Sequence, residues 1–87
     1  MPKRYLVIYD YDFIIVIAKS IKECVEKLAD YTGNKDQLLT KAFNGCEEPQ
    51  DYINMFNRFA NYTINSICEL GNKIYADAGI EEHYTIK

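Results

Sequence analysis

Two apolar segments joined by a short acidic turn constrain the fold of this chain more than any other feature. Residues 5–9 (YLVIY) and residues 13–18 (FIIVIA) are rich in β-branched and aromatic side chains, which favour β-strands. Between them lie Asp10, Tyr11 and Asp12, and Asp tolerates the backbone angles of tight turns. The sequence therefore predicts a β-hairpin over residues 4–18.

Neither segment has a polar face. A strand with one side in water alternates apolar and polar residues, whereas both of these segments are apolar throughout. One face of the hairpin must therefore pack against the rest of the chain. The other face needs a cover as well, which residues 61–87, a second copy of the chain or a partner protein can supply.

Helical periodicity follows the hairpin. Ser20 and Glu23 have the spacing of a capping box, apolar residues then recur at helical intervals, and Gly33 is typical of a helix end. Pro49 suits the first position of a later helix. The sequence predicts helices at about residues 20–32, 35–44 and 49–60.

Residues 61–80 are compatible with two structures. A helix over about 64–78 is favoured, because the apolar residues fit one helical stripe. Against it, Gly71 inside a helix costs about 1 kcal/mol relative to Ala. The alternative is a second hairpin in which Gly71-Asn72 forms the turn between residues 67–70 and 73–76.

The composition is that of one small globular domain. The chain has 87 residues, of which 48% are hydrophobic and 14% aromatic, so it has enough apolar material for a core. We expect a single α+β domain over residues 1–87, with the antiparallel N-terminal hairpin packed against three or four amphipathic helices. The alternating tail, residues 83–87, is compatible with a short edge strand.

Charge and cysteine content indicate the environment and the partners. The formal net charge is −3, and the basic residues are scattered rather than gathered in a stripe, which disfavours direct nucleic-acid binding. The helix expected at 49–60 carries only Arg58 as a cation, which is unlike a groove-reading helix. The uncharged run 13–18 is too short to cross a membrane. Three cysteines and no recognisable signal peptide favour the cytoplasm.

One short motif suggests catalysis. Asp10 and Asp12, after an apolar strand, resemble the Asp-x-Asp motif of haloacid-dehalogenase-type phosphatases, in which one carboxylate attacks phosphorus or binds metal and the other acts as an acid. However, Ile14 stands where that motif usually has Thr or Val, and a second strand follows instead of a crossover helix. The sequence favours a hairpin turn over a catalytic pair.

The cysteines do not form a recognisable site. Cys24 and Cys68 are expected to be small core residues on helices. Cys46 precedes a helix, which favours a reactive thiolate, but Glu47 and Glu48 oppose its formation. The spacing of the cysteines and the single histidine does not match a zinc signature. We therefore predict no metal, no cofactor and no enzymatic activity.

Tyrosine is unusually abundant, with eight residues, and tyrosine is favoured at protein interfaces. Together with the acidic balance, this predicts a non-catalytic module that binds a basic protein surface. The specific hypothesis is a phage-encoded inhibitor of a host defence nuclease, similar in action to anti-CRISPR proteins. The alternative is a small homodimeric structural or regulatory protein whose hairpin self-associates. The predicted contact residues are Asp10, Tyr11, Asp12, Glu47, Glu48 and Asp51.

Overall fold

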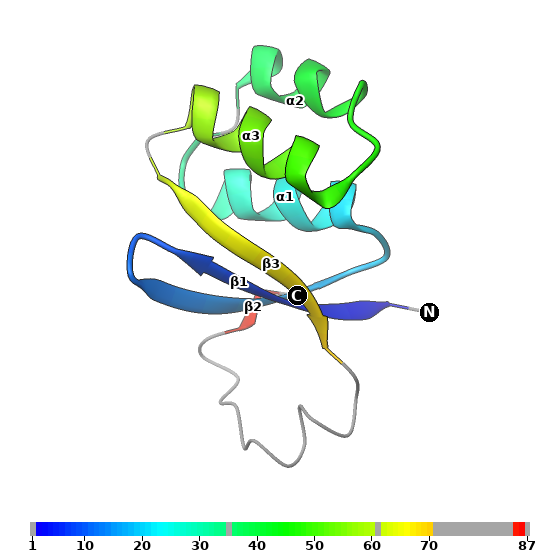
Figure 1. The fold of residues 1–87 in the computed structure, drawn as a ribbon, viewed down its shortest axis with the longest axis vertical. Helices are drawn as coiled ribbons and strands as arrows, with labels where there is room; N and C mark the ends of the chain where they lie inside the picture. The colour runs from blue at the N-terminus through cyan, green and yellow to red at the C-terminus, as the bar shows by residue number, and fades with distance from the viewer. Residues whose placement is uncertain (1, 35, 61, 71–84, 87) are drawn as a thin grey trace.

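The computed structural model describes residues 2–34, 36–60, 62–70 and 85–86. Within them, one sheet carries three helices on one of its faces (Figure 1). The strands are β1 (Lys3–Tyr9), β2 (Asp12–Ala18), β3 (Ile64–Leu70) and the two-residue β4 (Thr85–Ile86), in the order β3-β1-β2-β4. The first three strands pair antiparallel, and β4 runs parallel to β2 at the edge. The helices are α1 (Ile21–Tyr31), α2 (Gln37–Phe43) and α3 (Pro49–Phe59).

The predicted hairpin is confirmed, with a turn one residue shorter than expected. Asp12 pairs with Tyr9 in the β1–β2 ladder, so only Asp10 and Tyr11 form the loop. Both have positive φ angles, 45° for Asp10 and 68° for Tyr11. This is the backbone of a type I′ turn, whose twist matches that of the flanking strands.

β1 is the central strand of the antiparallel part of the sheet. It pairs with β2 from Lys3 to Tyr9 on one edge and with β3 from Arg4 to Tyr9 on the other. Tyr5 and Val7 are buried against the helices. On the opposite face of β1, Leu6 is half-buried and Ile8 is exposed, so the apolar sequence of this strand is not matched by burial on both faces.

The three helices begin and end where their capping residues predict. The Ser20 hydroxyl accepts the backbone N–H of Glu23 at 3.2 Å at the start of α1. Asp36 Oδ1 accepts the N–H of Leu38 at 2.7 Å at the start of α2. Gly33, with φ of 75°, follows the end of α1 and adopts the left-handed conformation common there.

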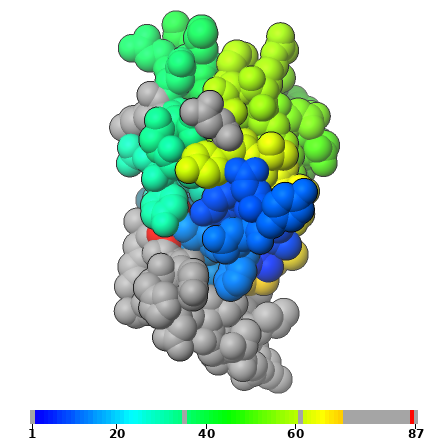
Figure 2. Space-filling model, turned by 90° about the vertical axis from the view of Figure 1, so that its left-hand side faces the viewer, coloured from blue at the N-terminus to red at the C-terminus, as the bar shows by residue number. Residues whose placement is uncertain are grey.

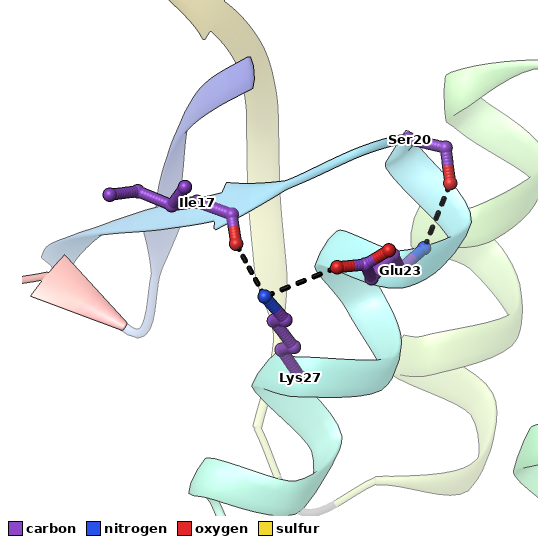
Figure 3. A network of polar contacts seen from close by, with 4 residues as sticks. All are labelled: Ile17, Ser20, Glu23 and Lys27. Atoms are coloured by element: carbon purple, nitrogen blue, oxygen red, sulfur yellow. Dashed lines mark hydrogen bonds and ion pairs between the residues drawn. The ribbon is translucent and has the colours of Figure 1, made fainter. Parts of the chain in front are cut away.

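The core lies between the sheet and the helices. α1 packs against β2, α3 packs against β3, and α2 lies on α3 away from the sheet (Figure 1). The largest fully buried side chains in this core are Phe43, Phe56, Leu28, Leu39, Ile64, Val7, Val16 and Val25. A polar contact joins α1 to β2: Lys27 Nζ donates to the Ile17 carbonyl at 2.7 Å and lies 3.2 Å from Glu23 Oε1 (Figure 3).

The favoured helix over residues 64–78 is wrong for its first seven residues. Residues 64–70 form β3, and residues 71–78 lie outside the described residues. The competing hairpin also required a strand at 67–70, but its second arm, 73–76, is not described. The physical reason is tertiary, because the open edge of β1 offers a full ladder of backbone partners to this segment.

The side chain of Asn57 fixes the point at which β3 begins. Its Nδ2 donates to the Ile64 carbonyl at 3.0 Å, and its Oδ1 accepts the Ile64 N–H at 2.7 Å. Asn57→Ala should therefore lower the free energy of unfolding by about 1–3 kcal/mol, because buried backbone groups lose their partners. Asn54→Ala on the exposed side of α3 is the matched control, expected within about 0.5 kcal/mol of wild type in urea denaturation. Equal stabilities of the two variants would contradict the role of Asn57.

Tyr11 occupies a backbone conformation that costs a non-glycine residue about 1–2 kcal/mol. Tyr11→Gly removes that cost from the folded chain. The glycine also gives the unfolded chain more conformational entropy, which lowers the stability by about 0.4–1 kcal/mol. The net expectation is a stabilisation of roughly 0.5–1 kcal/mol, measured by urea denaturation. Leu38→Gly, at an exposed position of α2, should instead destabilise by about 1 kcal/mol. A loss of stability in Tyr11→Gly would show that the turn is not strained.

Candidate functional site

The six predicted contact residues lie in two groups at opposite ends of α3 (Figure 1). Residues 10–12 form the hairpin tip, which contacts the segment leading into β3: the N–H of Asp10 donates to the Thr63 carbonyl, and Asp10 Oδ1 accepts the Thr63 N–H, both at 3.1 Å. Glu47, Glu48 and Asp51 lie at the beginning of α3. An 11-residue helix is about 16 Å long, so the two groups do not form one patch.

Tyrosine side chains gather around the hairpin tip. Tyr11 is fully exposed, at 104% of its reference area, and the rings of Tyr9 and Tyr62 meet edge to face with centroids 5.8 Å apart. Figure 2 shows this end of the molecule, where the hairpin reaches the surface between the end of α1 and the segment entering β3. We define the tip patch as Tyr9, Asp10, Tyr11, Asp12, Tyr31 and Tyr62.

The tip patch is an acidic and aromatic environment. The pKa of Tyr9 is raised first by burial and then by the groups around it, which are Tyr31, Asp12, Tyr62 and Asp10. The phenol of Tyr9 therefore keeps its proton at neutral pH and is available as a hydrogen-bond donor. The patch offers aromatic area and phenolic hydroxyl groups beside carboxylate acceptors, which suits contact with a basic protein surface.

The two carboxylates of the tip bind backbone amides. Asp10 Oδ1 accepts the Thr63 N–H, and Asp12 Oδ1 accepts the Phe13 N–H at 2.8 Å. Such bonds are typical of aspartates that shape turns, which agrees with the interpretation of this motif as a hairpin turn. Asp10 thus helps to join the tip to β3, while Tyr11 and Asp12 project from it.

One of the three acidic residues at the beginning of α3, Asp51, is engaged in hydrogen bonds to the backbone. Asp51 Oδ2 accepts the N–H of Glu48 at 3.0 Å and the N–H of Glu47 at 3.2 Å. These two bonds, that from Glu48 first, lower the pKa of Asp51 because they favour its ionised form. Asp51 therefore caps the start of α3, and the exposed side chains of the group are Glu47 and Glu48.

The cysteines occupy three different environments. Burial raises the pKa of Cys24 to about 12, which makes it an unreactive core thiol, as expected. Burial and then Asp51 raise the pKa of Cys46, whose Sγ donates to the Ala42 carbonyl at 3.4 Å. The prediction that Cys68 is a core residue on a helix is wrong, because it lies on β3 and is exposed.

The far face of the hairpin is open only near the tip. Ile8 and Phe13 are cross-strand partners and are 39% and 41% exposed, whereas Ile15 on the same face is fully buried. The exposed part of this apolar face, Ile8 and Phe13, therefore lies directly beside the tip patch. Of the tyrosines in the tip patch, only Tyr11 is among the contact residues predicted from the sequence; Tyr31 and Tyr62 were missed because only the topology brings them to the tip.

Comparison of the chain with protein families, curated proteins and solved structures finds no match. Within the described part of the chain, no group of three His, Cys, Asp or Glu residues is arranged to hold a metal ion. No helix among the described residues is long and apolar enough to cross a membrane. The tip patch is therefore a candidate site on geometry and chemistry alone.

The cap formed by Asp51 predicts a pH-dependent contribution to stability. Because its pKa is lower in the folded chain than its ordinary value of 3.8, ionised Asp51 stabilises the fold above that value. The contribution is lost as the pH falls through the lowered pKa. Asp51→Asn should therefore be less stable than wild type at pH 7, and the difference in thermal midpoint should shrink on acidification. Glu47→Gln removes the same charge without removing the cap, so a matching shrinkage in that variant would contradict the assignment.

Proposed function

We propose that this chain is a non-catalytic protein-binding module that engages a basic partner through the tip patch. The observation that carries the proposal is Tyr11, a large aromatic side chain held fully in solvent by a left-handed backbone. At that position Gly or Asn avoids the backbone cost of about 1–2 kcal/mol. A strained and exposed aromatic residue adds little to folding, so its use at this position is best explained by binding.

The surroundings of Tyr11 support this assignment. Tyrosine is among the residues that most often contribute strongly to protein interfaces, and here Tyr9 and Tyr62 lie beside the exposed ring. Asp12 supplies an exposed carboxylate at the same tip. A surface that combines rigid aromatic anchors with acidic groups favours a partner with Lys or Arg at its centre.

The specific form of the proposal is a phage-encoded inhibitor of a host defence nuclease. Nucleases of this kind hold nucleic acid in positively charged channels, which attract acidic proteins. The net charge of −3 and the acidic hairpin tip suit such a channel. In this proposal Tyr11 and Asp12 enter the channel, and Glu47 and Glu48 form a separate contact at the other end of α3.

The test uses purified RNA-guided nucleases and their target DNA. The chain in excess should inhibit cleavage by at least one nuclease and should bind it in the absence of target. Tyr11→Gly should weaken that binding at least about tenfold, the effect of losing a central aromatic anchor, even though it stabilises the fold. Asp12→Lys should weaken binding as well, through charge repulsion.

The double variant Glu47→Lys/Glu48→Lys separates the two acidic groups. This variant should retain the part of the affinity that comes from the tip patch, because Glu47 and Glu48 lie at the other end of α3. Inhibition by Tyr11→Gly equal to that by wild type would refute the role of the tip patch. Inhibition of none of the nucleases would refute the inhibitor hypothesis.

One observation favours homodimerisation as a second candidate function. Ile8 and Phe13 form an exposed apolar pair beside the tip, and a second copy of the chain can cover it. Light scattering over a range of concentrations tests homodimerisation, because it measures the molar mass in solution. A mass that rises to that of a dimer in wild type, and remains monomeric in Ile8→Lys, supports self-association, whereas a monomer at all concentrations contradicts it.

A further inference from the structure

A cavity of about 320 Å³ opens at the end of the molecule opposite to the tip patch. The start of β1, the junction of β2 with α1, the beginning of α3 and the end of β3 form its walls, and Figure 1 shows these segments together on the side of the N-terminus. The volume lies at the lower end of the range for small-molecule sites. Its chemistry is separate from that of the proposed protein-binding surface.

Tyr5 places a hydroxyl group at this cavity. The residue lines the cavity although only 5% of its surface is exposed, because its ring packs in the core between sheet and helices. The hydroxyl forms no hydrogen bond with another described residue. Burial, and then the carboxylate of Glu69, raises the pKa of Tyr5, so the group keeps its proton. A hydroxyl at a cavity wall that no other described residue occupies is available to a ligand.

Further donors surround the same space. Lys19 lines the cavity and forms no ion pair within the described part of the chain. Ser20 Oγ accepts the Glu23 N–H at 3.2 Å, so its own proton can be donated to a ligand. Lys3 lies 3.8 Å from Glu69, which balances the one carboxylate among the described lining residues. The described lining therefore carries one positive charge in excess.

The rest of the described cavity wall is apolar and includes the first residue of α1. Ile21, Pro49 and Ile67 complete the described lining. α1 begins at Ile21, and the first turn of a helix favours negative charge. We propose that this cavity binds a small organic oxyanion, with its carboxylate or phosphate group on Lys19, Ser20 and Tyr5 and a short apolar body against Ile21 and Ile67.

The experiment is a titration of the full-length, nitrogen-15-labelled chain with phenyl phosphate, with benzoate and with benzyl alcohol, followed by amide chemical shifts. The two anions should shift the amides of residues 19–21 in a saturable way, and the neutral alcohol should not. The tighter of the two anions identifies the head group. Shifts that do not saturate, or equal shifts with the alcohol, would overturn the proposal.

Four variants make the assignment specific. Lys19→Gln should weaken binding about tenfold, which corresponds to one charge-assisted hydrogen bond. Tyr5→Phe keeps the core ring and should weaken binding without loss of the folded spectrum. Glu69→Gln should tighten binding, since it removes the repelling carboxylate and frees Lys3. Lys41→Gln, on α2 outside this cavity, should bind like wild type. Equal weakening by Lys41→Gln and Lys19→Gln would show that only general charge attraction is at work.

Discussion

The pairing of β1 along both of its edges is the constraint on which the rest of the structure depends. β1 pairs with β2 in the hairpin. It also pairs with β3, which lies more than fifty residues further along the sequence. Because side chains alternate across the strands, residues such as Tyr5, Val7 and Val16 form one apolar face of this three-stranded unit, on which α1 and α3 pack. α1 carries the chain from the end of β2 back toward the hairpin tip, and α3 carries it toward the start of β3 beside the tip (Figure 1).

This arrangement separates two chemically different ends. The hairpin tip, the end of α1 and the segment entering β3 meet at one end and bring four tyrosines together with Asp10 and Asp12. The beginnings of α1 and α3 meet the start of β1 at the other end, where Lys3, Lys19 and Tyr5 line a cavity. The first end suits contact with a large basic surface, and the second suits a small anion.

At the tip, the preferred backbone conformation and the identity of the side chain oppose each other. The type I′ turn is favoured by the twist of the hairpin, but its second position carries Tyr11 instead of the usual Gly. The bond between Asp10 and Thr63 holds the turn against the segment that enters β3. The ring of Tyr11 therefore stands on a turn held by the Tyr9–Asp12 pair and by the bonds of Asp10 to Thr63, and in the proposed binding role this would lower the entropy lost.

Local signals in the sequence determined the hairpin and the three helices. The turn aspartates, Ser20, Gly33 and Pro49 act within a few residues of themselves, so their consequences are visible without a structure. The segment 64–70 was decided only by tertiary structure, because its apolar residues fit a helix as well as a strand. Pairing with the edge of β1 and the two hydrogen bonds between Asn57 and Ile64 favour the strand over the helix. The same long-range pairing moved Cys68 to the surface and brought Tyr62 to the tip, and it also divided the acidic residues into two groups.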